Sequence, residues 1–100
     1  MEIKINEENG GYVAEFNGRL DTPAAISAQQ NMTPLMENAD KEITLDYTNL
    51  EYISSSGFRL FLALRKETSL KGGKVIIKNI NDEIKKVFMM TGFFNLFEIV

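Results

Sequence analysis

Three consecutive serines, Ser54, Ser55 and Ser56, precede Gly57 and a strongly apolar segment, residues 58–64. Serines directly before such a segment predict the N-terminus of a helix, because a side-chain oxygen accepts a hydrogen bond from a first-turn N–H group. One hydroxyl is enough for this cap, and three are present. A phosphorylated serine carries a charge of about −1.5 to −2, which the positive end of a helix tolerates best. From the residues alone a helix cap is the favoured interpretation, and the motif by itself does not decide between a cap and a phosphorylation site.

The absence of histidine and cysteine limits the reactions and metal sites that the chain can support. The chain has no histidine and no cysteine, which excludes Ser-His-Asp and Cys-His catalysis, disulfides and most zinc sites. Neither Gly10-Gly11 nor Gly72-Gly73 is followed by the Lys-Ser or Lys-Thr of a phosphate-binding loop, and no Gly-x-Gly-x-x-Gly motif occurs. We therefore expect a binding protein that is not an enzyme and that carries no cofactor.

Two aspartates, Asp21 and Asp46, fall where predicted strands give way to a helix or a loop. Open α/β sheets place their sites at this edge, and each aspartate also suits the cap of a turn or helix. Carboxylates beside a row of hydroxyls are candidate ligands for Mg²⁺. One or two carboxylates rarely hold this ion without a phosphate ligand, so we expect caps and no metal site.

Length and composition limit the fold and the partners. A chain of 100 residues suffices for one hydrophobic core, which predicts a single domain over residues 1–100. The net charge is −3 and no dense run of Lys and Arg occurs, so nucleic acid is not an expected partner. No apolar stretch approaches the roughly 20 residues that span a bilayer, and the N-terminus lacks the apolar core of a signal peptide. We expect a cytoplasmic protein without membrane contact.

The first half of the chain predicts a hairpin followed by helices. Ile3 and Ile5 alternate with polar residues, as do Tyr12, Ala14 and Phe16, and turn residues separate the two runs. A helix capped by Asp21 or Thr22 is expected next, with Pro23 near its first position. Pro34 then predicts a break or a second short helix capped by Thr33.

The second half predicts alternating strands and helices. A strand over residues 42–47 ends near Asp46, and a loop leads from it to the serines. The helix that opens there closes at Lys71 before Gly72, where a glycine is typical of a helix end. The remaining elements are a strand over 74–78, a helix capped by Asn81 with Ile84, Val87, Phe88 and Thr91 on one face and Gly92 at its end, and a last strand over 97–100. The apolar tail, which holds Phe93, Phe94, Leu96 and Phe97, is expected in the core.

This β-β-α-β-α-β-α-β order predicts a small α/β domain whose mixed sheet has helices packed on at least one face. Residues 46–58, from Asp46 through the three serines to Phe58, resemble the signature of bacterial anti-sigma factor antagonists, which are STAS domains. Residues 18–21, Gly-Arg-Leu-Asp, resemble the upstream Gly-Glu-Leu-Asp of that family. Thr91-Gly92-Phe93 and the apolar end resemble its C-terminal part, so the similarity covers essentially the whole chain.

The resemblance implies a phosphorylation switch. In such proteins the unmodified antagonist binds an anti-sigma factor, which is itself a serine kinase, and a sigma factor is thereby released. The kinase phosphorylates the antagonist, and a serine phosphatase resets the cycle. The acceptor is the serine two residues before the glycine, here Ser55 with neighbours Ser54 and Ser56. The surface near the acceptor is expected to include Arg19, Asp21, Thr22, Gly57, Phe58 and Arg59.

Two positions depart from the family pattern. Ser54 stands where the family often has aspartate, and Arg19 stands where it has glutamate, which reverses a charge on the expected docking face. The alternative to a switch is a STAS scaffold or accessory subunit that binds the same way and is never phosphorylated, as in stress-signalling complexes or lipid transport. A phosphate on Ser55 in cells distinguishes the two.

Overall fold

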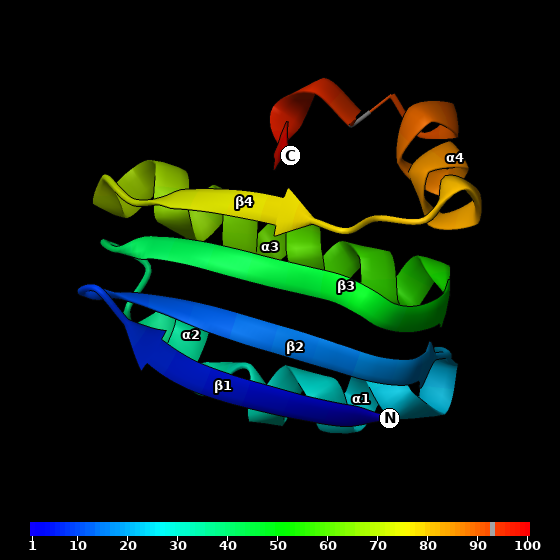
Figure 1. Cartoon of the computed structure of the whole chain (residues 1–100), viewed down its shortest axis with the longest axis horizontal. Coiled ribbons are helices and arrows are strands. Elements are labelled where there is room, and N and C mark those ends of the chain that lie inside the picture. The colour runs from blue at the N-terminus through cyan, green and yellow to red at the C-terminus, as the bar shows by residue number, and fades with distance from the viewer. Residues whose placement is uncertain (93) are drawn as a thin grey trace.

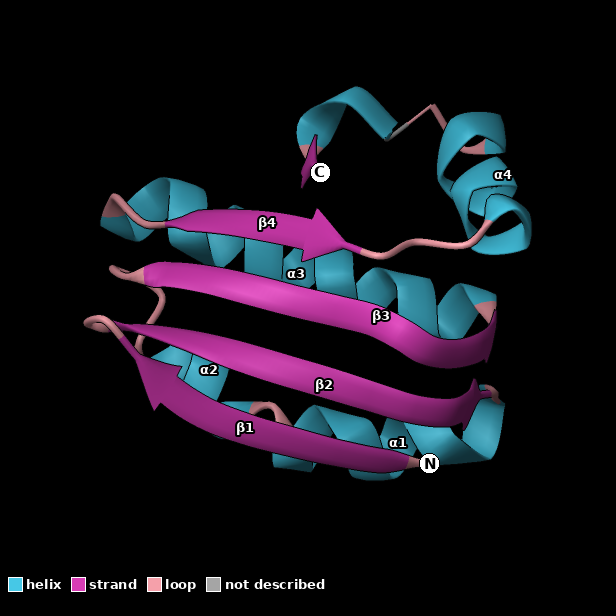
Figure 2. Cartoon of the chain, in the orientation of Figure 1, coloured by secondary structure: helices cyan, strands magenta, loops and turns pink. Residues whose placement is uncertain are grey.

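A mixed five-stranded sheet forms the frame of the molecule in the computed structural model, which describes residues 1–92 and 94–100 (Figures 1 and 2). The strands lie in the order β1-β2-β3-β4-β5. Strands β1 and β2 are antiparallel, and each later neighbour is parallel. Their bounds are β1 (Glu2–Glu8), β2 (Gly11–Leu20), β3 (Glu42–Ile53), β4 (Lys74–Lys78) and β5 (Glu98–Ile99). The mixed α/β sheet predicted from the sequence is confirmed.

The opening hairpin is built by local turn chemistry. Glu8 pairs with Gly11, so Asn9 and Gly10 form a two-residue turn. Their φ angles are 52° and 80°, and both are positive, as a type I′ hairpin turn requires. Asparagine and glycine tolerate this conformation better than other residues, so the sequence itself fixes the turn.

The helices connect the parallel strands. Their bounds are α1 (Thr22–Asn31), α2 (Thr33–Glu37), α3 (Ser55–Lys71) and α4 (Asp82–Met90), and a short 3₁₀ helix, η1 (Phe94–Leu96), precedes β5. Helices α1, α2 and α3 lie behind the sheet in Figure 1, so they cover a single face. In β2 and β4, half-buried or exposed residues, most of them polar, alternate with the buried ones, as expected for a sheet with one solvated face.

Aromatic side chains fill the core between the sheet and the helices. Phe16, Tyr47 and Phe61 lie within 5.2–5.9 Å of one another between ring centres, and none is exposed. Phe88 of α4 joins this cluster through Tyr47 at 6.4 Å. In the described part of the chain the Tyr47 hydroxyl has no hydrogen-bond partner, and burial raises the pKa of this phenol well above its ordinary value.

Four details of the sequence prediction are corrected by the structure. Strand β3 continues to Ile53, so Asp46 lies inside a strand and not at its end. The reason is that residues predicted as loop pair with β2 as far as Leu20. A second short helix forms at Pro34, but Met32 is its N-cap and Thr33 is its first residue. Thr91 is exposed and not on the buried face of α4, and the last strand is confined to residues 98–99.

The apolar tail is only partly core. Phe97 is 7% exposed and packs on Phe88 at 5.2 Å, whereas Leu96 is 40% exposed. Phe94 is half-buried. Phe93, which belongs to the predicted core and to the C-terminal motif, lies outside the described residues.

Candidate functional site

Two parallel strands, β2 and β3, end side by side, and this edge assembles the predicted site. Leu20 pairs with Ile53, and the Ser54 N–H donates to the Leu20 carbonyl oxygen at 2.8 Å. Immediately after this pair the chain enters α1 on one side and α3 on the other. The starts of both helices are therefore held together, although more than thirty residues separate them in sequence.

The three serines take different roles at the start of α3. Ser54 is the N-cap, and its Oγ accepts a hydrogen bond from the Gly57 N–H at 3.1 Å. It is 7% exposed. Ser55 is the first residue of the helix and is exposed, and Ser56 is half-buried. The cap and an accessible hydroxyl at the positive helix end are thus separate side chains.

Gly57 and Phe58 position this helix and are not accessible. A Cβ atom at Gly57 would lie 2.7 Å from the Leu20 Cγ, so only glycine lets α3 approach β2 this closely. Phe58 is 5% exposed and packs edge-to-face on Phe88 with ring centres 4.8 Å apart. Both residues were expected on the partner surface; in the structure both are buried.

Asp21, Thr22 and Arg59 lie near the starts of α1 and α3. Asp21 is the N-cap of α1, and its Oδ1 accepts from the Ala24 N–H at 2.9 Å. Thr22 begins α1, and its side chain is exposed. Arg59 is exposed on α3, four residues after Ser55, and this spacing places both on one face of the helix. The three residues contribute polar and charged groups of both signs to this edge.

Arg19 lies against an aromatic ring that the sequence did not single out. It pairs with Tyr52 across β2 and β3, and its guanidinium carbon lies 4.4 Å from the Tyr52 ring centre. This is a cation–π contact, and Tyr52 is 41% exposed. Two register shifts between β2 and β3 precede the pairing of Arg19 with Tyr52. The alternation of polar and apolar residues along the sequence does not reveal such shifts. The available signal in the sequence was an aromatic residue close to the serines, between Glu51 and Ile53.

Asp46 is separate from this edge. It pairs with Glu15 in the middle of the sheet. Partial burial would raise the pKa of Asp46, but hydrogen bonds from the Thr48 hydroxyl, the Thr48 N–H and Asn79 outweigh it and lower the pKa below its ordinary value. Asp46 and Asp21 therefore do not form a pair of ligands. Among the described residues, no group of three or more His, Cys, Asp or Glu side chains could hold a metal ion.

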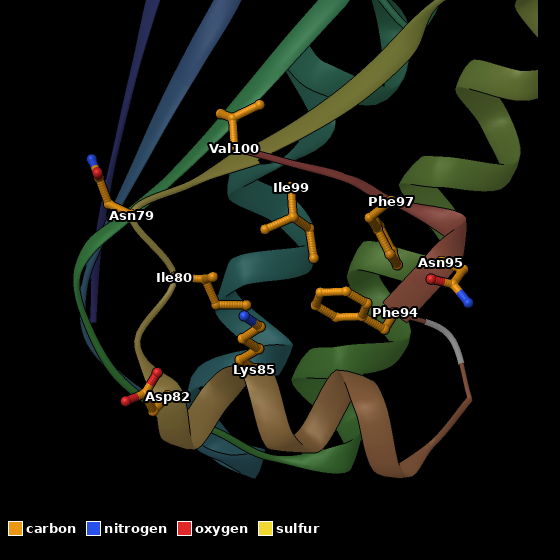
Figure 3. A pocket seen from close by; sticks show the side chains of 9 residues that line it. All are labelled: Asn79, Ile80, Asp82, Lys85, Phe94, Asn95, Phe97, Ile99 and Val100. Carbon is orange, nitrogen blue, oxygen red and sulfur yellow. The ribbon is translucent and has the colours of Figure 1, made fainter.

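Another hollow lies away from this edge, between the start of α4 and the C-terminal segment (Figure 3). Its volume is about 510 Å³, and the Lys85 ammonium inside it lies 5.6 Å from the Phe94 ring centre. The lining residues are Asn79, Ile80, Asp82, Lys85, Phe94, Asn95, Phe97, Ile99 and Val100. None of the predicted site residues is among them.

A smaller hollow of about 200 Å³ adjoins the serine motif. It is lined by Glu51, Tyr52, Ile53, Glu83, Ile84 and Val87. Its two carboxylates and Tyr52 were not expected at a site. They meet only because α4 packs beside the end of β3, where the Asn81 side-chain amide donates to the Leu50 carbonyl oxygen at 3.1 Å.

Comparison with known proteins gives a consistent result. The family model of the STAS domain matches residues 2–100. The anti-sigma-B factor antagonist of Staphylococcus aureus is 22% identical over 99 residues, which cover 99% of this chain and 92% of that protein. The solved structure of the anti-sigma factor antagonist SpoIIAA in its unphosphorylated form superposes on this chain with a TM-score of 0.77. The structure of Bacillus SpoIIAA in the phosphorylated form superposes with a TM-score of 0.76. Identity is 21% and 20%, and the matches cover 99% of this chain and 87% and 91% of those chains.

No helix in residues 1–92 or 94–100 is both long and apolar enough to cross a membrane.

Proposed function

This chain belongs to the STAS domain family, and on that premise we propose that it is an anti-sigma factor antagonist switched by phosphorylation of Ser55. In the unmodified state it binds an anti-sigma factor that is a serine kinase, and a sigma factor is released. A serine phosphatase restores the binding state. The protein acts as a binding regulator in the cytoplasm and catalyses no reaction.

The observation that carries this proposal is that two neighbouring serines have different roles: Ser54 caps α3, and Ser55 leaves its hydroxyl exposed. Ser54 is buried and caps α3, so its hydroxyl is already engaged. Ser55 is exposed at the first position of the helix, where a kinase can reach it. A cap that also served as acceptor would lose its hydrogen bond on modification. Here the helix start keeps its cap in both states.

Electrostatics explains how the phosphate would act. The helix N-terminus stabilises a dianion on Ser55, so the fold survives modification. A partner packed on the same edge meets new negative charge and must desolvate it, which weakens the complex. The Arg19 guanidinium near this edge stacks on the Tyr52 ring of the sheet.

The test is binding of an anti-sigma factor serine kinase from the same genome to three forms of the protein. We expect Ser55→Ala to bind as the wild type does and to resist inactivation by ATP. Ser55→Asp should bind at least tenfold more weakly, which corresponds to about 1.4 kcal/mol. Its unfolding midpoint should stay close to that of the wild type. Calorimetric titration and urea unfolding measure the two quantities.

Intact mass and peptide mapping of protein from its native cells complete the test. A phosphate on Ser55 supports the switch. Equal binding by Ser55→Asp and wild type, or a protein that stays unmodified under growth and stress alike, would contradict it and favour a scaffold that is never phosphorylated. A phosphate on Ser54 would contradict the assignment of the acceptor, because Ser54 is the cap.

A further inference from the structure

The hollow between the end of β3 and α4 has an apolar floor and an acidic rim. Ile53 and Ile84 at its floor are 5% and 1% exposed, and Val87 is half-buried. Glu51 and Glu83 on its rim are exposed, and Tyr52 forms a wall. Ile53 is directly followed by Ser54, so the hollow continues the edge that carries the serine motif.

A bulge directs Glu51 toward this hollow. Gly18 of β2 pairs with Leu50 of β3, and the next residue, Arg19, pairs with Tyr52. Glu51 is therefore the extra residue of a bulge and pairs with no residue of β2. Bulges of this kind turn a side chain away from the regular alternation and are common beside functional sites. Glu83 reaches the same rim from the first turn of α4.

The two carboxylates take no part in the ion pairs of the described residues. In the part of the chain that the structure describes, every ion pair within 4.0 Å involves other residues: Asp40–Lys41, Glu67–Lys71, Glu42–Lys74 and Glu98–Lys74. Neither Glu51 nor Glu83 belongs to one. A hollow with apolar walls and two carboxylates at its mouth is complementary to a side chain with an apolar stem and a cationic head.

We propose that this hollow receives an arginine side chain of the partner protein. The stem would lie over Ile53 and Ile84, and the guanidinium would donate to Glu51 and Glu83. Arginine fits better than lysine because its planar fork has several donors for two carboxylates and packs well against an aromatic wall. Tyr52 already carries the guanidinium of Arg19 at 4.4 Å, so the same ring accepts this chemistry.

The inference rests on the proposed function in identifying the partner as the anti-sigma factor, and it adds the chemistry that the partner must present. Rim charges of this type mainly set the association rate, its salt dependence and the choice of partner. The hollow would thus discriminate among related anti-sigma factors, while Ser55 would turn binding on and off.

The hollow can be tested without the partner. The probe is N-acetylarginine N-methylamide, and its neutral counterpart is N-acetylcitrulline N-methylamide, which has the same length and shape. Titration is followed in the methyl NMR spectrum of the full chain, with the δ1 methyl groups of Ile53 and Ile84 as reporters. The variant Glu51→Gln/Glu83→Gln removes both charges. Glu8→Gln is the matched control, because Glu8 is exposed at the far end of the sheet beside the hairpin turn.

We expect the arginine probe to shift both reporters saturably and the citrulline probe to bind about fivefold more weakly, because it lacks the charge. The double variant should bind the arginine probe about fivefold more weakly, as expected for two exposed ion pairs, and Glu8→Gln should bind it as the wild type does. An unchanged amide spectrum of the double variant shows that it remains folded. Added salt should weaken binding.

The proposal is overturned if the two reporters do not move, if both probes shift them equally, or if the double variant binds the arginine probe as tightly as the wild type. None of these results bears on Ser55, whose role is measured by phosphorylation and by the Ser55 variants. Conversely, an unphosphorylated Ser55 would leave arginine binding by the hollow unaffected.

Discussion

At the scale of single residues, adjacent serines with the same chemistry differ in what surrounds them. Ser54 continues β3 with extended backbone and turns its hydroxyl toward the Gly57 N–H. Ser55 is the first residue of the helix, and its side chain is exposed. Ser54 also stands where the family often has aspartate, and both side chains are good N-caps. The departure from the family pattern therefore preserves the physical role of the position.

This difference gives a stability prediction. Ser54→Ala should lower the free energy of unfolding by about 1 kcal/mol, because the Gly57 N–H loses its acceptor in a buried position. Ser55→Ala should change it by less than about 0.5 kcal/mol, as is usual for an exposed side chain. Urea unfolding of both variants measures the pair. Equal losses would show that the cap is not confined to Ser54.

At the scale of elements, the connection from β4 to α4 is tied to β3 by asparagine side chains. The Asn79 amide donates to the Asp46 carboxylate at 3.3 Å and to the Thr48 hydroxyl at 2.9 Å. Asn79 has a φ of 61°, a conformation that asparagine tolerates better than most residues. Asn81 caps α4 and also bonds the carbonyl oxygen of Leu50. These contacts set where α4 begins and so where the acidic hollow forms.

The Asp46 carboxylate makes this connection sensitive to acid. Its pKa is lowered in the folded state, so its contribution to stability is present above the unfolded pKa, near about 4, and is lost as the pH falls through the folded value. We expect Asp46→Asn to be less stable than the wild type near neutral pH. The difference should shrink as the pH is lowered toward about 2. Urea unfolding of both proteins across this range measures it, and a constant difference would contradict the assignment.

At the scale of the whole molecule, the Phe88 ring is one of the contacts that join α4 and the C-terminal segment to the rest. Phe88 is fully buried and contacts Tyr47 of β3, Phe58 of α3 and Phe97. The N-terminal turn of α3, which carries Ser55, thus packs on the same ring that holds α4. The serine motif and the acidic hollow therefore share this support.

Removal of the Phe88 ring should weaken the packing beneath both the serine motif and the acidic hollow. Phe88→Ala should lower the free energy of unfolding by about 3–5 kcal/mol, because a large buried side chain leaves a cavity. Its neighbour Met89 is 58% exposed, so Met89→Ala is the matched control and should have little effect. Thermal unfolding compares the two. A small effect of Phe88→Ala would mean that α4 is held by its cap rather than by the core.

Much of the architecture follows from local signals in the sequence. Asn9 and Gly10 specify the turn of the hairpin, Asp21, Ser54 and Asn81 cap their helices, and Gly72 ends α3 with a φ of 83°. Such features depend on a few neighbouring residues, whose side-chain chemistry and backbone freedom suffice to determine them. The motif around Ser55 was identified in the same way, because it lies within one contiguous stretch.

Only the tertiary structure decided the length of β3, the burial of Gly57 and Phe58, and the meeting of Glu51 with Glu83. Pairing with β2 extends β3 beyond its alternating segment, and the bulges there shift the register in a way that residue type does not encode. The sequence by itself determined most of the elements and the starts of α1, α3 and α4. The contacts between distant elements determined which side chains face solvent together, because a surface is made by packing and not by spacing along the chain.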